Sequence, residues 1–336
     1  MALGELSVSV VVPTFERAEQ LRRTLSALCA LDYPAELLEI IVVDDGSMDD
    51  TPEALRAIEP GCPSVRYVRQ SNLGVATARN RGARYANGDI VMFVDDDIVV
   101  PPHNVRQHLA ARAEYGECIV SGHSEFSPEL RAALHRTPFG RFRLEREDYF
   151  KADLAARFGS HGRILPDGLS AQNISIGRDT FWTLGGFDEE FPFAGAEDHD
   201  FARRARQAGC TIVHDYDIRV LHLDEHRDLH AYCRRQERSA ITAVYLARKY
   251  PDQLNEPIIN RNAPLRRGDS VRVSARKITR ALLSHRISLA IAHLIVGAIE
   301  LLRPKGGWPL EVAYRWMTGL YVFRGVRLGF RLTSAR

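Results

Sequence analysis

Three consecutive carboxylates, Asp95-Asp96-Asp97, directly follow the apolar run Ile90–Val94. Acidic side chains at the end of a buried strand are costly to desolvate unless a cation neutralises them. Carboxylate oxygens suit Mg²⁺ or Mn²⁺, and an ion held in this way can bind a diphosphate on its other side. The pattern therefore predicts a metal site that receives a phosphorylated ligand.

A second acidic pair, Asp44-Asp45, ends the apolar run Ile40–Val43 and leads into Gly46-Ser47. In open α/β sheets, ligands bind at the carboxyl ends of the strands. Two acidic strand ends therefore predict a crevice for a nucleotide and a metal at one edge of a sheet. The alternative is that these acids cap helices or lie in solvated turns.

Strand and helix patterns alternate in the part of the chain that leads to these acids. The expected strands are residues 8–12, 38–43, 65–68 and 90–94, and the expected helices are residues 17–31, 52–58 and 75–86. This βαβ order predicts a mostly parallel, doubly wound sheet. Beyond Asp97 we expect an irregular region at 124–167, strands at 118–122, 172–176 and 218–223, and helices at 103–115, 179–184, 196–208 and 229–249.

The composition and the cysteines indicate a globular protein in a reducing compartment. The chain has 336 residues, of which 45% are apolar, and this is enough for one large domain or two modest ones. Residues 1–7 carry no basic region typical of a signal peptide. The cysteines are scattered without CxxC spacing, which favours reduced cytosolic thiols over a disulfide framework or a zinc site. They are Cys29, Cys62, Cys118, Cys210 and Cys233.

The net charge of +2 conceals an uneven distribution. Residues 261–336 contain fifteen Lys or Arg and three acids, a charge of +12, so that residues 1–260 carry −10. A basic segment on an acidic body predicts an anionic partner. Because the segment is also apolar, we expect a cytoplasmic protein that is peripheral on an anionic membrane surface, rather than one that binds nucleic acid.

Two stretches of this basic segment have the composition of helices. Ile287–Leu302 is sixteen mostly apolar residues, fewer than the about 20 that span a bilayer. Trp308–Phe330 combines aromatic residues with Arg324 and Arg327, which predicts an amphipathic helix at a membrane interface. The alternative is that the two helices pack on each other or form a homodimer contact. The expected division is a domain at 1–250, a linker at 251–270 and a basic helical tail at 271–336.

Six short motifs occur in order along the first 200 residues. They are Val10–Arg17, Val42–Ser47, Asn72-Leu73-Gly74 with Ala78–Gly82, Asp95-Asp96-Asp97, Gly185–Glu189 and Glu197–Asp200. Together they closely resemble family 2 of the inverting glycosyltransferases, which have the GT-A fold, over about residues 7–250. The resemblance implies a Rossmann-like, mostly parallel sheet flanked by helices. It also implies metal-dependent, inverting transfer of a sugar from a nucleotide sugar, expected to be UDP-linked, to an acceptor hydroxyl in glycan or glycoconjugate biosynthesis.

The resemblance places the nucleotide-sugar donor at the carboxyl edge of the sheet. Its expected contacts are Pro13, Thr14, Glu16, Arg17, Asp45, Arg79, Asp95 and Asp96. Asp45 is expected to accept the N–H of the base, Arg79 to face the base or the diphosphate, and Asp95 to hold the ribose. Independently of the resemblance, the negative charge that develops on a leaving diphosphate needs a metal ion or fixed cations.

Inversion requires one base that takes the acceptor proton while the acceptor attacks from the opposite side. Glu197-Asp198 begin the expected helix at 196–208, where the helix dipole favours an ionised carboxylate. The resemblance selects Asp198 as the base and Glu197 as an acceptor contact. The alternative is that these acids, with Asp200, only stabilise the start of the helix.

The resemblance assigns the metal, Mn²⁺ or Mg²⁺, to Asp97 and Asp95, and His222 is the candidate that completes the set. His222 ends the expected strand that follows the base helix, and a neutral imidazole suits Mn²⁺ better than Mg²⁺. His214 and His226 are nearby competitors. The alternative for His222 is a hydrogen-bonded histidine at the edge of the sheet.

The acceptor is expected beside Gln172, Asn173 and Trp182, in addition to Glu197. The face of a Trp ring stacks well on a sugar, and ordinary core packing is the alternative for Trp182. The sequence leaves open whether the acceptor is a glycan, a lipid-linked saccharide, a peptide or a small molecule.

Two other classes of protein share parts of this pattern. One is a catalytically silent GT-A-like binding or scaffold protein, against which the intact Asp95, Asp97 and Asp198 argue. The other is a sugar nucleotidyltransferase, which needs a Gly-rich triphosphate loop with a basic residue after the first strand. The segment Pro13-Thr14-Phe15-Glu16 is not such a loop.

Overall fold

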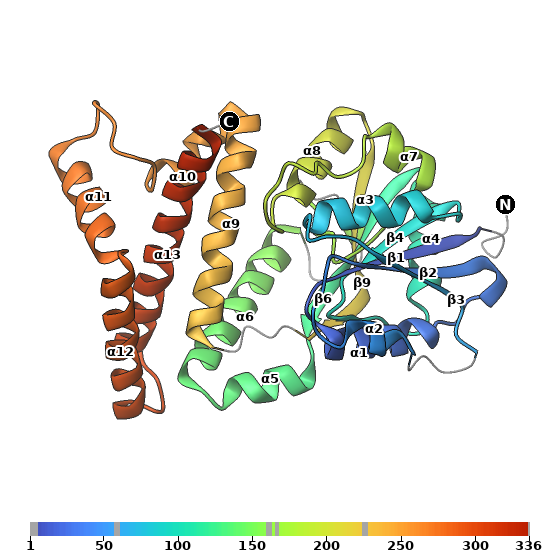
Figure 1. The fold of residues 1–336 in the computed structure, drawn as a ribbon, viewed down its shortest axis with the longest axis horizontal. Helices are drawn as coiled ribbons and strands as arrows, with labels where there is room; N and C mark the ends of the chain where they lie inside the picture. The colour runs from blue at the N-terminus through green and yellow to red at the C-terminus, as the bar shows by residue number, and fades with distance from the viewer. Residues whose placement is uncertain (1–5, 57–60, 159–162, 165–167, 224–227, 335–336) are drawn as a thin grey trace. The chain divides into compact units, whose positions relative to one another are not determined.

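The computed structural model describes residues 6–56, 61–158, 163–164, 168–223 and 228–334. The chain divides into two compact units (Figure 1). Unit 1 comprises Met1–Ser127, Ala152–Phe191 and Glu197–Asp224, and unit 2 comprises Pro128–Lys151, Pro192–Ala196 and Glu225–Arg336. This division differs from the expected one, because the helix at 229–249 groups with the basic segment and not with the first domain.

Within the described residues, unit 1 contains a sheet of nine strands. Its parallel part has the order β3 (Ser64–Arg69), β2 (Leu38–Asp44), β1 (Val8–Thr14) and β4 (Ile90–Val94), as the alternating pattern predicted. The order continues with β8 (Asn173–Gly177), β6 (Cys118–Phe126), β9 (Thr211–His222) and β5 (Ile98–Val99), and β7 (Arg163–Ile164) pairs with β9. The α/β fold is thus confirmed, and the sheet becomes mixed beyond β4, because β8 runs antiparallel to β4 and β6.

The strands of unit 1 direct apolar side chains alternately to two buried faces. Val10 and Val12 pack with Leu21 and Leu25 of α1 (Ala18–Cys29), whereas Val11 packs on the opposite face. One face is covered by α1, α2 (Thr51–Arg56) and α4 (Asn104–Tyr115), and the other by α3 (Val75–Tyr85), α7 (Arg178–Thr183) and α8 (Glu197–Gln207) (Figure 1). Because helices cover both faces, the strand ends are left for ligand binding.

The region at 124–167, which we expected to be irregular, is largely helical where it is described. It contains the end of β6, α5 (Pro128–His135) and α6 (Pro138–Phe158). Phe139 and Phe142 of α6 are buried in an aromatic cluster. The charged residues of α6 are spread around the helix, so its sequence shows no single apolar stripe from which the helix could be recognised.

Cys29 and Cys62 form a disulfide bond. Cys29 ends α1, and Cys62 lies 33 residues later in the loop that precedes β3. The expectation of reduced thiols is wrong for this pair, because the two cysteines meet through tertiary packing that their spacing does not reveal. Cys118, Cys210 and Cys233 are free. The bond removes the cysteine-based reason for expecting a reducing compartment.

Unit 2 is helical in its described residues. Two long helices, α9 (Leu229–Lys249) and α13 (Trp308–Ser334), pack along each other, and α12 (Arg286–Leu302) and α11 (Val271–Leu283) pack on α13. The expected linker contains two short helices, η2 (Pro251–Asn255) and α10 (Pro257–Asn260). The basic tail is therefore part of a packed helical unit.

The apolar helix α12 is buried on one face and exposed on the other. Leu289 and Val296 join Tyr314 of α13 in a buried cluster, as the packing alternative predicted. Ile287 and Leu294 are 66% and 75% exposed. Among the described helices, none is by itself long and apolar enough to cross a membrane, and α11 with α12 meets that criterion only as a pair bent by 80°.

Two glycines allow α9 and α13 to approach closely. A Cβ atom on Gly325 would lie 2.3 Å from the Glu237 carbonyl oxygen, and one on Gly329 would lie 2.8 Å from Cβ of Val244. We expect Gly325→Ala to lower the free energy of unfolding by about 1–3 kcal/mol, because the α9 backbone must move away. Gly319→Ala, in the same helix, would place a Cβ that meets no atom within 4 Å, and we expect it to be neutral or stabilising. Urea unfolding measures both variants, and equal stability would contradict the close approach.

Candidate active site

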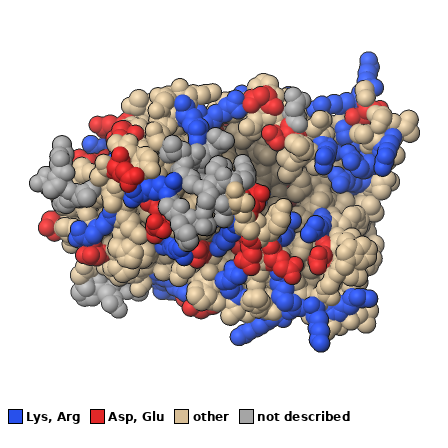
Figure 2. Space-filling model, turned by 180° about the vertical axis from the view of Figure 1, so that it is seen from behind, with Lys and Arg blue, Asp and Glu red and all other residues tan. Residues whose placement is uncertain are grey.

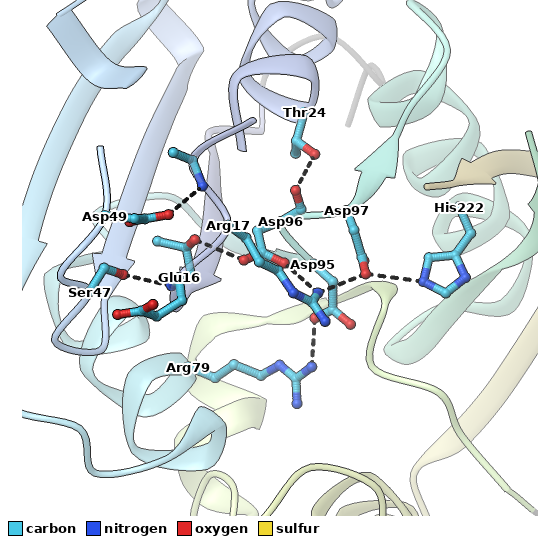
Figure 3. Close-up of polar contacts among 12 residues, drawn as sticks. Glu16, Arg17, Thr24, Ser47, Asp49, Arg79, Asp95, Asp96, Asp97 and His222 are labelled. Carbon is cyan, nitrogen blue, oxygen red and sulfur yellow. Dashed lines mark hydrogen bonds and ion pairs between the residues drawn. The ribbon is translucent and has the colours of Figure 1, made fainter. Parts of the chain in front are cut away.

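The loop after β4 places the three aspartates at the carboxyl edge of the sheet (Figure 3). Asp96 and Asp97 are buried, and the hydroxyl of Thr14, at the end of β1, donates to Asp96 at 2.8 Å. Arg17, just before α1, donates through Nη1 to Asp96 at 3.0 Å and to Asp97 at 2.7 Å. Two of the expected donor residues thus lie against the acidic cluster.

The charges in this cluster depend on one another. Burial alone would lower the pKa of Arg17, but the carboxylates of Asp96 and Asp97 raise it above its ordinary value. Burial raises the pKa of Asp96, and the charge of Arg17 opposes that shift. The guanidinium of Arg17 therefore supplies a cation of the kind that these buried carboxylates require.

His222 and Asp97 form the pair best suited to bind a metal ion. In the antiparallel pairing of β5 with β9, Ile98 lies opposite His222, which brings His222 beside Asp97. Nε2 of His222 lies 3.2 Å from the Asp97 oxygen that Arg17 contacts. Two ligands of an octahedral ion with bonds of about 2.1 Å lie about 3 Å apart, so the pair fits Mg²⁺ or Mn²⁺.

The third expected metal ligand, Asp95, is engaged elsewhere, because it accepts a hydrogen bond from Arg79 at 2.7 Å. In the part of the chain that the structure describes, no three His, Cys, Asp or Glu side chains are grouped closely enough to hold a metal ion. His214 lies beside His123, with ring centroids 5.7 Å apart, and burial together with His123 lowers the pKa of His214 to about 4. His226 lies outside the described residues. A bound diphosphate could supply additional ligands.

Arg79 of α3 links the acidic cluster to the start of α8. Its side chain is almost completely buried, and it donates to Asp95 at 2.7 Å (Figure 3). It also donates to Glu197 at 2.8 Å. Burial lowers the pKa of Arg79, but the charges of Asp95 and Glu197 more than reverse that effect. We expected Arg79 to face the nucleotide base or the diphosphate; in the structure it joins the two acidic ends of the site.

Asp198 is the carboxylate at the start of α8 that is best placed to act as a base. Glu197 is paired with Arg79, and Asp200 is fully buried and paired with Arg204 at 2.8 Å. Asp198 is half-buried, accepts the backbone N–H of His199 at 2.8 Å, and has no ion pair among the described residues. Burial and the adjacent charge of Glu197 raise its pKa to about 6.

Asn80, next to Arg79, holds the loop that leads toward α8. Its side chain donates to the Phe187 carbonyl at 2.7 Å and accepts the Phe187 N–H at 2.9 Å. Gly186 has a φ of 65°, and a Cβ there would lie 2.8 Å from Oδ1 of Asn80, so this loop requires glycine. Asn80 is not among the site residues predicted from the sequence, although its position directly after Arg79 in the Ala-Arg-Asn motif is a usable signal.

The remaining donor candidates shape loops at the same edge. Both carboxylate oxygens of Asp45 are engaged, by the N–H groups of Leu73 and Gly74 and by the side chain of Gln70, each at 2.8 Å. Glu16 has a φ of 56° and its N–H donates to Ser47 at 2.9 Å, which ties the loop after β1 to the loop after β2 (Figure 3). Pro13 lies within β1, opposite Val43.

The expected acceptor residues have supporting positions. Asn173 is buried in β8 and exchanges amide hydrogen bonds with Asn104 at 3.2 and 3.3 Å. The backbone carbonyl oxygen of Gln172 accepts a hydrogen bond from the backbone N–H of Asp95 at 3.1 Å. Trp182 packs edge-on against Phe181, which favours the core-packing alternative for this residue. Glu197 is the acceptor candidate that lies closest in sequence and space to Asp198.

Loss of Arg79 should destabilise the fold strongly. In Arg79→Leu, the carboxylates of Asp95 and Glu197 lose their shared buried partner, and breaking a buried pair in this way costs about 3–5 kcal/mol. Arg84→Leu, in the same helix, removes an exposed guanidinium that lies 3.7 Å from Glu189, and we expect a change of at most about 1 kcal/mol. Chemical denaturation of the two variants checks this difference, and similar stabilities would show that Arg79 does not connect the two ends.

Comparison with known proteins agrees with this geometry. Residues 9–165 match the sequence profile described as glycosyl transferase family 2. This part of the chain is a family 2 glycosyltransferase domain. The match covers β1 to β4 and the three aspartates, and it ends before α8.

Related sequences of the family 2 domain are named as glycosyltransferases. Validoxylamine A glucosyltransferase from Streptomyces hygroscopicus subsp. jinggangensis is 32% identical over 228 residues, which cover 61% of this chain and 53% of that protein. Glycosyltransferase AglE from Haloferax volcanii is 24% identical over 218 residues, which cover 63% of this chain and 65% of that protein. The chain spans about half the length of the validoxylamine A glucosyltransferases that it matches.

Solved structures extend the likeness over almost the whole chain. Mannosyltransferase PcManGT from Pyrobaculum calidifontis, solved in complex with GDP-Man and Mn²⁺, has a TM-score of 0.57 and 22% identity and covers 96% of this chain and 86% of its own. Residues 1–349 of TarS from S. aureus give a TM-score of 0.52 at 16% identity, with coverages of 98% and 92%. At these identities the likeness is one of fold, and it confirms the GT-A architecture of the family 2 domain.

Proposed function

We propose that the protein is an inverting, metal-dependent glycosyltransferase that moves a hexose from a nucleotide sugar to an acceptor hydroxyl. The observation that carries the proposal is the connection of Asp95 to Glu197 through the buried guanidinium of Arg79. In this proposal, Arg79 joins the end of the site that would bind the phosphates and the metal to the end that would supply the general base. The family 2 match and the GT-A fold support the same class of reaction.

In this proposal the acidic cluster and Arg17 bind the donor. Asp97 and His222 would hold the Mn²⁺ or Mg²⁺ ion, which supplies electrostatic stabilisation of the leaving diphosphate. Arg17 lies within 2.7 Å of Asp97 and presents a fixed positive charge at the same place. Asp95 and the loop that Asp45 holds contribute polar groups for the ribose and the base.

Asp198 would take the proton from the acceptor hydroxyl as that oxygen attacks the anomeric carbon. Of the three carboxylates at the start of α8 it is the one without an ion pair among the described residues, so it can face an incoming acceptor. Glu197 remains paired with Arg79. Its negative charge lies beside Asp198 and raises the pKa of that carboxyl group, which makes Asp198 a stronger base.

The proposed pKa of the base sets a pH dependence. Asp198 acts as a base only when ionised, and its pKa is raised to about 6. We therefore expect the rate to be highest above about pH 7 and to fall tenfold per pH unit well below pH 6. A profile of nucleoside diphosphate release between pH 4.5 and about 8 measures this limb. A rate that is unchanged at pH 5 would argue against Asp198 as the base.

The donor is expected to be a UDP-sugar, and GDP- and dTDP-sugars are the alternatives to compare. One solved relative was determined with GDP-Man and Mn²⁺, so the sugar nucleotide has to be chosen by experiment. Thermal shift of the purified protein with each nucleotide sugar, with Mn²⁺ and with EDTA, makes that choice. Stabilisation by one nucleotide class that disappears in EDTA is expected. No stabilisation by any donor would favour a silent scaffold.

The acceptor remains a glycan, a lipid-linked saccharide, a peptide or a small molecule. We also propose a location on the cytoplasmic face of a membrane, supported by the charge of +12 on residues 261–336 and by the exposed apolar face of α12. A homodimer through α12 is the alternative use of that face. Size-exclusion chromatography with light scattering distinguishes a dimer from a monomer.

A further inference from the structure

A basic cavity of about 490 Å³ lies within unit 2, and its lining shares no residue with the site described above. It is bounded by the turn between α11 and α12 and by one face of α13. Its lining residues are Glu237, Ala281, Ser284, His285, Arg286, Phe323, Arg324, Arg327, Leu328 and Arg331. The proposed glycosyl transfer makes no use of any of them.

The cavity has an excess of positive charge. Glu237 is the one acidic residue among those that line it. It forms an ion pair with Arg324, whose guanidinium group donates to both carboxylate oxygens at 2.5 Å. Arg286, Arg327 and Arg331 have no acidic partner among the described residues. Three arginines, of which Arg286 and Arg331 are exposed, thus line one cavity without an acidic partner, and an anion that binds there would reduce their mutual repulsion.

The start of α12 adds to this positive potential. Its N-cap residue, His285, makes no side-chain capping hydrogen bond, and the first turn contains no acidic residue. Arg286 occupies that first turn, where the helix dipole disfavours a cation. A negatively charged ligand in the cavity would interact favourably with the N-terminal end of the helix dipole. It would also reduce the repulsion among the clustered arginines.

The chemistry of the walls indicates a phosphate ester. The planar guanidinium group matches the oxygens of a phosphate, to which it can donate two hydrogen bonds. The apolar side chains of Phe323 and Leu328 line the same cavity, which is much larger than an inorganic phosphate ion. A phosphoryl group attached to an organic residue therefore fits better than a free inorganic anion.

The surroundings indicate a lipid as the source of the phosphate. Leu282 and Ile287, on either side of the α11–α12 turn, are 69% and 66% exposed. Other large apolar side chains exposed on α11, α12 and α13 include Val271, Ile278, Leu294, Leu301 and Trp308. In Figure 2, Lys and Arg side chains form several groups on the surface, with Asp and Glu side chains and uncharged surface between them.

We propose that this cavity binds the phosphate group of an anionic membrane lipid, while the exposed apolar side chains of α11 and α12 enter the interfacial region of the bilayer. The 80° bend between these helices suits two segments that lie in the interface. The proposal does not depend on glycosyl transfer. It requires that the arginines of the cavity contribute more to vesicle binding than the same number of charges placed elsewhere on unit 2.

The test is flotation of the full chain with phosphatidylcholine vesicles, with and without phosphatidylglycerol. Arg286→Gln/Arg327→Gln/Arg331→Gln removes the three charges of the cavity. Arg272→Gln/Arg276→Gln/Arg315→Gln removes the same charge from exposed positions outside it. We expect binding only with phosphatidylglycerol, and a partition coefficient for the cavity variant that is lower than that of the control variant by about tenfold or more.

A third arm identifies the source of the phosphate. Glycerol 3-phosphate and inorganic phosphate are titrated into the protein by calorimetry in the absence of vesicles. Equal losses in the two triple variants would show general charge attraction and overturn the cavity assignment. Tight binding of a soluble phosphate without vesicle binding would overturn the lipid source, and binding to neither would overturn the proposal. Circular dichroism and thermal melting confirm that both variants are folded.

Discussion

Asp198→Asn is expected to lower the rate of nucleoside diphosphate release in the presence of acceptor by about 10²–10⁴-fold. The amide preserves the shape of the side chain but cannot accept the proton of the attacking hydroxyl. Nucleotide binding should change little, because Asp198 lies at the start of α8 and the acidic cluster follows β4. Steady-state kinetics with the donor chosen by thermal shift, together with calorimetry of the nucleotide, separate the two effects.

A matched control for this variant is Asp179→Asn on α7, whose side chain is 97% exposed. It should retain the full rate. If Asp198→Asn also turns over at a near-normal rate, the base lies elsewhere. Glu197 would be the next candidate, although its pairing with Arg79 at 2.8 Å makes it less available.

Asp97→Ala is expected to reduce transfer below detection, a loss of more than about 10²–10³-fold. Asp97 contacts both Arg17 and His222, so its removal takes away the ion pair and one of the two best-placed metal ligands. Mn²⁺-dependent nucleotide binding should weaken in the same variant. Calorimetric titrations of the nucleotide with Mn²⁺ and with EDTA measure this change directly.

Thermal melting serves as the control for Asp97→Ala, because a buried carboxylate is lost and Arg17 keeps Asp96 as a partner. A folded variant without activity supports the assignment. Full activity of the wild-type protein in excess EDTA, or an active Asp97→Ala protein, would refute the role of the metal.

The strand ends of unit 1 could be predicted because their signal is local. The apolar runs before Asp44 and Asp95 end where charged residues begin, and the parallel order of the four strands places these ends at one edge. The position of His222 at the end of a strand could also be predicted, and in the structure that strand end lies beside Asp97.

The contacts that connect distant segments could not be predicted in the same way. Arg79 and Glu197 are 118 residues apart, and neither carries a local sign of its partner. The same is true of Cys29 and Cys62. The exposure of one face of α12 could not be predicted either. A helix with apolar residues on every face has the same sequence pattern whether one face or both faces are buried.

In the proposed reaction, the sharing of Arg79 between Asp95 and Glu197 would link occupancy of the donor site to the pKa of the base. The charge of Arg79 lowers the pKa of Asp198, and it is partly neutralised by Asp95. A donor that engages Asp95 leaves more of that charge for the start of α8, so the base ionises more readily once the donor is bound. We therefore expect Asp198 to stay ionised to a lower pH in the donor complex than in the free protein.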